Sequence, residues 1–130
     1  MSVSHTEAAV RARRKTVTRR RGWLFLKAGD RLTLCRKVMG LRLGEKVEQI
    51  TEVEVLSVRR ERLDAITAAD IEREAVPAET FTPDLIAGAP RVHEMACADC
   101  RRANWIGWFA RTMGGGVDQI VTRIEWRYLG

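Results

Sequence analysis

The sequence has few cysteines, prolines and aromatic residues, and it has no long apolar run. Its 130 residues include three cysteines, three prolines and 6% aromatic residues. An odd, small number of cysteines argues against a disulfide framework. No apolar run approaches the roughly 18 residues of a membrane span, and no apolar h-region follows the N-terminus. We therefore expect a cytoplasmic protein that does not associate with membranes.

Acidic residues are almost missing from the N-terminal segment. Residues 1–21 hold seven basic residues and one acid, Glu7, and this excess equals the net charge of +6 of the whole chain. The other 109 residues hold 16 residues of each sign. Arginine suits bidentate contact with phosphate. The basic segment predicts contacts with an anionic or nucleotide-like ligand through Arg13, Arg14, Arg19, Arg20 and Arg21.

Alternating apolar residues predict strands over 31–38, 47–59 and 119–129, with a bulge near Val55 and Leu56. A capping-box pattern from Thr67 predicts a short helix over 68–75, and Asn104 is expected to cap a second helix that ends at Met113. Residues 78–100 are expected to be irregular. These elements predict an α+β fold, either a small barrel with two or three short helices or a two-layer sandwich.

Four stretches of the chain together form a pattern of motifs. They are Lys15–Arg20, Lys27–Leu32, Glu48–Val58 with Leu63–Glu74, and Val121–Trp126. Their order and spacing resemble the ASCH family, a branch of the PUA-like β-barrels that is associated with RNA. The resemblance implies a single domain over 13–130 with an insertion at about 77–116. Residues 1–12 would then form a flexible basic arm.

Some small ASCH proteins that this sequence resembles hydrolyse the N4-acyl amide of cytidine nucleosides. Their active site uses a Lys and a Thr from the N-terminal element and a Glu after the long strand. The matching positions here are Lys15, Thr18 and Glu74, with Glu72 as the alternative match for the acid.

These three residue types are sufficient for acyl transfer from an exocyclic amide. A threonine hydroxyl needs a nearby base to act as a nucleophile. Lysine is such a base when burial or neighbouring cations lower its pKa, and Glu74 can orient the amine or move a proton. The hydrolase hypothesis requires no cofactor. The structural alternative is a solvated basic arm with an incidental threonine.

The basic segment also supports a non-catalytic interpretation, namely an RNA-binding module that uses this segment and the barrel cleft. Phosphate contacts supply affinity that does not depend on base sequence. Trp23 and Phe25 can stack on unpaired bases, although their apolar block also suits a core. A ribonuclease is a third hypothesis, ranked below both.

The spacing of His93, Cys97 and Cys100, H-x3-C-x2-C, suits three ligands of a structural zinc ion, with Cys35 as the fourth ligand. The alternative is buried thiols at a chance spacing. Trp105, Trp108 and Phe109 follow the i, i+3, i+4 spacing of a helix face that packs in a core.

Overall fold

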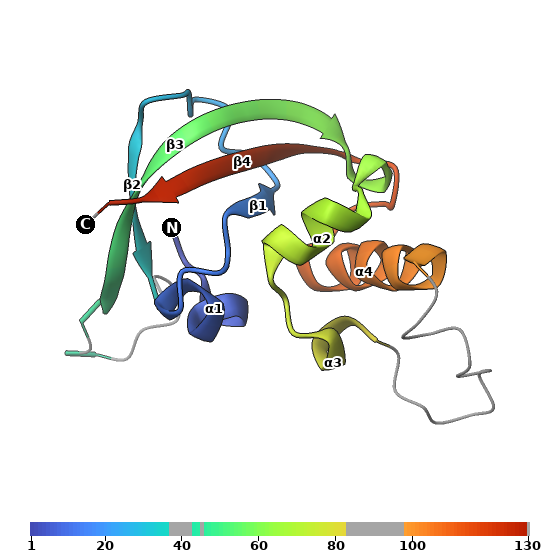
Figure 1. Ribbon diagram of the computed structural model, residues 1–130, viewed down its shortest axis with the longest axis horizontal. Helices are drawn as coiled ribbons and strands as arrows, with labels where there is room; N and C mark the ends of the chain where they lie inside the picture. The colour runs from blue at the N-terminus through green and yellow to red at the C-terminus, as the bar shows by residue number, and fades with distance from the viewer. Residues whose placement is uncertain (37–42, 45, 83–97, 130) are drawn as a thin grey trace.

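The computed structural model describes residues 1–36, 43–44, 46–82 and 98–129. Two long strands, β3 (Gln49–Arg62) and β4 (Ile120–Tyr128), lie side by side and arch over the helices (Figure 1). The remaining elements are η1 (Ser4–Thr6), α1 (Glu7–Arg11), β1 (Val17–Arg20), β2 (Arg31–Cys35), η2 (Leu63–Ala65), α2 (Ala68–Glu74), α3 (Ala78–Phe81) and α4 (Ala98–Met113).

The four strands form one antiparallel sheet in the order β1-β4-β3-β2. The register between β3 and β4 shifts between Val55 and Ser57, which confirms the predicted bulge. Leu56, the extra residue, is 47% exposed. The α+β class is confirmed. Within the described residues the strands are joined in this open order, so closure into a barrel stays a prediction.

Helix α2 begins as the capping pattern predicts. The Thr67 hydroxyl accepts a hydrogen bond from the Asp70 N–H at 3.2 Å, and the helix ends where Ala75 adopts a left-handed conformation, two residues before Pro77. Helix α4 differs from the prediction, because Asn104 lies inside it and the helix begins at Ala98. Asp99 lies in its first turn, where a carboxylate interacts favourably with the helix dipole.

The N-terminal residues also differ from the prediction, since the expected flexible arm over 1–12 contains η1 and α1. Val3, Ala9 and Val10 are buried. The Val3 N–H donates to the Cys35 carbonyl at 2.9 Å, and the Cys35 N–H donates to the Met1 carbonyl at 2.8 Å, so this segment lies along β2. Most of the basic residues follow this buried stretch, which is why charge alone suggested an arm.

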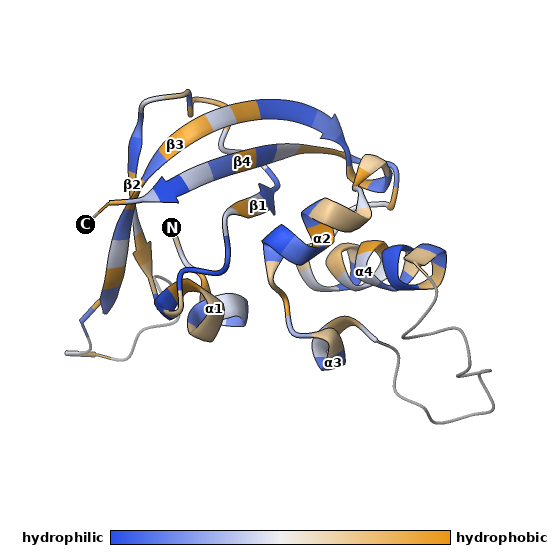
Figure 2. Cartoon of the chain, viewed as in Figure 1, coloured by the Kyte–Doolittle hydropathy of each residue, from blue (hydrophilic) through white to orange (hydrophobic). Residues whose placement is uncertain are grey.

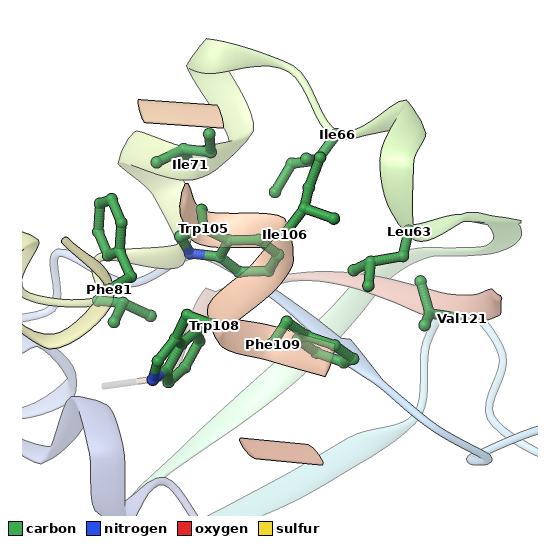
Figure 3. Packing of buried hydrophobic residues seen from close by; sticks show 10 residues of the cluster. Leu63, Ile66, Ile71, Phe81, Trp105, Ile106, Trp108, Phe109 and Val121 are labelled. Carbon is green, nitrogen blue, oxygen red and sulfur yellow. The ribbon is translucent and has the colours of Figure 1, made fainter. Parts of the chain in front are cut away.

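The core has two apolar clusters, one of which is drawn in Figure 3. The sheet cluster packs β2, β3 and β4 on the N-terminal residues and includes Leu34, Val53, Ile124 and Trp126. The helical cluster surrounds α4, whose side chains pack between Phe81 on one side and Leu63 and Val121 on the other. It contains Trp105, Trp108 and Phe109, as the helical spacing predicts. No helix in the described part of the chain is long and apolar enough to cross a bilayer.

Candidate functional site

A cavity of about 160 Å³ lies where the N-terminal segment, β1, the end of α2 and α4 meet. The three residues proposed for acyl transfer, Lys15, Thr18 and Glu74, all line this cavity, and each is at most 3% exposed. Lys15 and Glu74 are 59 positions apart in the chain. The fold therefore brings together the residues that the family resemblance selected.

Lys15 is held by contacts at both of its ends. Its Nζ donates to the main-chain carbonyl of Glu74 at 2.7 Å and to Glu74 Oε1 at 3.2 Å. Its own carbonyl accepts from Trp126 Nε1 at 3.0 Å and from the Tyr128 hydroxyl at 2.5 Å. Burial lowers the pKa of the Lys15 amine, and the nearby Glu74 carboxylate opposes this only in part. The environment thus favours the neutral amine more than water does.

Glu74 is the last residue of α2, and its carboxylate lies between two cations. Oε1 accepts from Lys15, and Oε2 accepts from Arg19 Nη1 at 3.2 Å. The alternative acid, Glu72, is exposed and pairs with Arg101 at 2.7 Å on the outer face of α2. Of the two matches considered from the sequence, Glu74 is the one that lines the cavity.

A buried network of ions lies directly behind Glu74. Arg19 Nη2 donates to Asp70 Oδ2 at 2.5 Å and to Glu61 Oε1 at 2.6 Å. Arg123 donates two hydrogen bonds to the Asp70 carboxylate, from Nε to Oδ2 at 2.7 Å and from Nη2 to Oδ1 at 3.1 Å. Arg123 and then Arg19 hold the pKa of the Asp70 carboxyl well below its usual range.

Sequence reasoning missed Asp70, Arg123 and Glu61 as partners. The strand pattern placed Arg123 on the polar face of β4, yet that residue is 4% exposed because Asp70 of α2 lies over it. The available signal was the charge pattern itself, since Glu61 near the end of the long strand and Asp70 and Glu74 after it are carboxylates that can pair with an inward-facing arginine.

The five arginines predicted to contact nucleic acid lie in three different environments. Arg19 is inside the protein, where its guanidinium pairs with three carboxylates, so it offers no surface contact. The reason is that this strand is covered by α2 on the side that Arg19 faces. Arg13, Arg14 and Arg21 are exposed. Arg13 lies over the Tyr128 ring, and Arg21 donates to the Met113 carbonyl at 3.1 Å.

Arg20 lines the cavity and is partly buried. Its Nη2 donates to the Ser2 carbonyl, which ties β1 to the N-terminal wall of the cavity. Burial lowers the pKa of Arg20. Its buried Nε has no hydrogen-bond partner within the described part of the chain.

The opposite wall of the cavity is aromatic. Trp105, Trp108 and Phe109 of α4 all line it, and the Trp105 and Phe109 rings stack with centroids 5.6 Å apart. His5 meets the Trp108 ring edge-on at 5.9 Å. The indole nitrogen of Trp105 is buried without a hydrogen-bond partner among the described residues. One wall therefore carries charge and the other presents flat apolar surface.

Two of the predicted zinc ligands, His93 and Cys97, lie outside the residues that the structure describes. Cys100 is in the first turns of α4, and Cys35 is buried in β2. The residues that the structure describes contain no group of three His, Cys, Asp or Glu side chains that could hold a metal. The H-x3-C-x2-C site stays a prediction.

Comparisons with known proteins support the fold. No protein-family model matches the chain, and no curated protein matches it. A solved structure does match, the crystal structure of protein EF3133 from Enterococcus faecalis, described by the family model DUF984. The TM-score is 0.56 at 10% sequence identity, over 95% of this chain and 69% of that chain. At this identity the likeness shows a shared fold alone.

Proposed function

We propose that this protein is an amidohydrolase that removes the acyl group from N4-acylated cytosine nucleosides. The observation that carries the proposal is the meeting of Lys15, Thr18 and Glu74 in one cavity, with the Lys15 amine buried and its pKa lowered. A nucleophile, a base with a lowered pKa and a group that orients the base are the parts that acyl transfer needs.

The size of the cavity favours a single ring as the ligand. Its volume of about 160 Å³ is close to that of an engineered protein cavity of roughly 150 Å³ that binds benzene. The aromatic wall from Trp105, Trp108 and Phe109 suits a planar base. A pyrimidine with a small acyl group therefore fits the space better than a stacked oligonucleotide does.

The hydrogen bonds of Lys15 suit the role of a general base. A neutral amine has two N–H donors and one lone pair. Glu74 provides two acceptors, its carbonyl and its Oε1, and these take both donors. The lone pair then remains for the proton of the Thr18 hydroxyl. As that proton moves to Lys15 Nζ, Thr18 Oγ attacks the acyl carbon of the substrate.

The remaining steps return the enzyme to its starting state. The positive charge of Arg20, which lines the cavity, stabilises the negative oxygen of the tetrahedral intermediate. The C–N bond breaks, the Lys15 ammonium gives its proton to the departing N4 amine, and an acyl ester forms on Thr18. Water then attacks the ester with Lys15 again as the base, which releases the carboxylic acid and restores the threonine.

Turnover of N4-acetylcytidine to cytidine, followed by chromatography, tests this proposal. Lys15→Ala and Thr18→Ala should each lower kcat/KM by about 100-fold or more, as expected for loss of a base or a nucleophile. Glu74→Gln should also be impaired, whereas the matched control Glu72→Gln should retain activity, because Glu72 is exposed on the other side of α2. Absence of turnover by the wild-type protein, or full activity in Thr18→Ala, would exclude the mechanism.

We propose that the sheet closes as a PUA-like barrel around the sheet cluster. The likeness to the DUF984 structure supports this, and so does the bridge between Ser2 and Cys35, which adds the N-terminal residues to the outer side of β2.

The second candidate function is a non-catalytic RNA-binding module. It is favoured by the exposure of Arg13, Arg14 and Arg21. Replacing these three arginines with Gln should weaken RNA binding and its dependence on salt. Unchanged RNA binding in that triple variant would exclude the basic segment as the contact surface.

A further inference from the structure

A second hollow lies on the outer side of the sheet, between the β1–β2 connection and β3. The apolar residues that line it include Trp23, Leu24 and Leu56, and the charged residues that line it are Lys27, Arg59 and Arg60. It shares no lining residue with the cavity that contains Lys15. The end of β3 that carries Arg59 and Arg60 is a hydrophilic stretch (Figure 2). We call this hollow the outer groove.

Large apolar side chains are exposed along the outer groove and beside it. Leu24 is 70% exposed, Phe25 is 76% exposed and Leu56 is 47% exposed. The Phe25 ring rests against the Trp23 ring, with centroids 5.5 Å apart and planes tilted by 35°. Exposed apolar groups gathered in one patch mark a surface that binds something.

The loop that presents these rings is fixed at both ends. The Thr122 hydroxyl accepts from Arg60 at 2.5 Å and donates to the Gly22 carbonyl. Asp30 and Gly29 exchange backbone hydrogen bonds with Val55 at 2.8 Å. The rings are therefore held outward by tethers to β3 and β4.

Trp23 adds evidence of strain, because its φ is +57°. This conformation is unfavourable for a bulky residue, and such strain persists only where the surrounding structure enforces it, frequently at ligand contacts. The strained Trp23 is the ring that supports Phe25. The loop thus retains an unfavourable backbone and an exposed aromatic pair at the same place.

We propose that the outer groove binds single-stranded nucleic acid. Every charged residue that lines it is cationic, which complements a phosphate backbone. The aromatic pair offers a ring face on which unpaired bases stack. Arg59 and Arg60 are oriented by their bonds to Glu61 and Thr122, so phosphate contacts at the edge of the groove are already positioned. This site is independent of the proposed hydrolase activity.

Fluorescence anisotropy with a labelled oligouridylate of about ten nucleotides tests the proposal, since small folds bind strands of this length. Phe25→Ala should weaken binding about 5- to 150-fold, the range that one stacked base contributes. The three cations predict a slope of about −2 for log K against log salt, and Arg59→Gln should reduce it by about 0.7. The matched controls are Val117→Ala, an exposed apolar residue elsewhere, and Arg62→Gln, on the same strand outside the groove lining.

Three results would overturn the proposal: no binding by the wild-type protein, equal binding by Phe25→Ala and Val117→Ala, or binding of anionic vesicles in place of the oligonucleotide. Circular dichroism of each variant checks that it is folded. Phe25→Ala should hydrolyse N4-acetylcytidine as well as the wild-type protein does. Failure of the groove and failure of the hydrolase are therefore distinguishable.

Discussion

Replacing Asp70 with Asn should strongly destabilise the protein. The Asp70 carboxylate is 3% exposed and accepts hydrogen bonds from Arg19 at 2.5 Å and from Arg123 at 2.7 and 3.1 Å. Asparagine keeps the shape but lacks the negative charge, and its amide presents N–H groups to one of the two arginines. Arg19 would keep Glu61 and Glu74 as partners, whereas Arg123 would be left with Glu125, 4.0 Å away.

The magnitude follows from the burial of the pair. Removing one partner of a buried ion pair typically costs about 3 to 5 kcal/mol. For a chain of 130 residues the entropy of unfolding converts this to a fall in Tm of roughly 10 to 20 °C. Thermal unfolding followed by circular dichroism measures the change. The matched control is Asp64→Asn, which removes the exposed partner of Arg62 and should leave Tm close to that of the wild-type protein.

The effect should also depend on pH in one direction. In the folded protein the pKa of Asp70 is held well below its ordinary value of 3.8. The unfolded chain therefore takes up a proton near pH 4 while the folded chain remains ionised. The stabilisation by Asp70 is fully present above about pH 5. It is lost progressively as the pH falls from there toward the lowered pKa that Asp70 has in the folded protein. A Tm of Asp70→Asn within about 3 °C of wild type at pH 7 would refute this account of the network.

Other predictions concern the cavity and the N-terminal segment. Lys15→Met should abolish hydrolysis and should destabilise the protein less than Asp70→Asn does at pH 7, because burial already lowers the pKa of this amine and Glu74 keeps Arg19 as a partner. A loss of unfolding free energy in urea as large as that of Asp70→Asn would contradict this. The acid limb of log kcat/KM against pH should have its midpoint below 10.5, since activity needs the neutral amine and burial lowers the pKa of Lys15, and a midpoint at or above 10.5 would argue against Lys15 as the base. Val10→Ala should destabilise the protein by about 1 to 2 kcal/mol in urea unfolding, because two buried methyl groups are lost, whereas a flexible arm would show no change.

The parts of the fold that were predictable from the sequence are those set by local patterns. The bulge in β3 was visible because the apolar alternation changes phase at Val55 and Leu56, and Thr67 marked the start of α2. The selection of Lys15, Thr18 and Glu74 came from the family resemblance, because no local period links positions so far apart. Their meeting in one cavity is a tertiary fact that the structure supplies.

The rest depends on contacts between distant segments. The alternation over 119–129 does not show which distant residues a charged side chain meets, and Arg123 is buried because Asp70 of α2 lies over it. Likewise, the apolar side chains among residues 1–12 are mostly small, so the order of this segment depends on pairing with β2. Helix α4 begins before Asn104, at Ala98. Its first turns carry polar residues without an amphipathic period, so the sequence pattern does not mark this start.

The division of the core into two clusters has a consequence for how the molecule moves. The cavity lies at the boundary between them, since Val3 belongs to the sheet cluster and Trp105 to the helical cluster. Beside the cavity, the strands of the sheet cluster and the helices of the helical cluster are joined by ion pairs. The chief pairs are those of Arg19 on β1 and Arg123 on β4 with Asp70 on α2. Small relative displacements of the two clusters can change the width of the cavity while each apolar cluster keeps its packing. A change in cavity width would thus be taken up at the charged groups, with no need to melt either core.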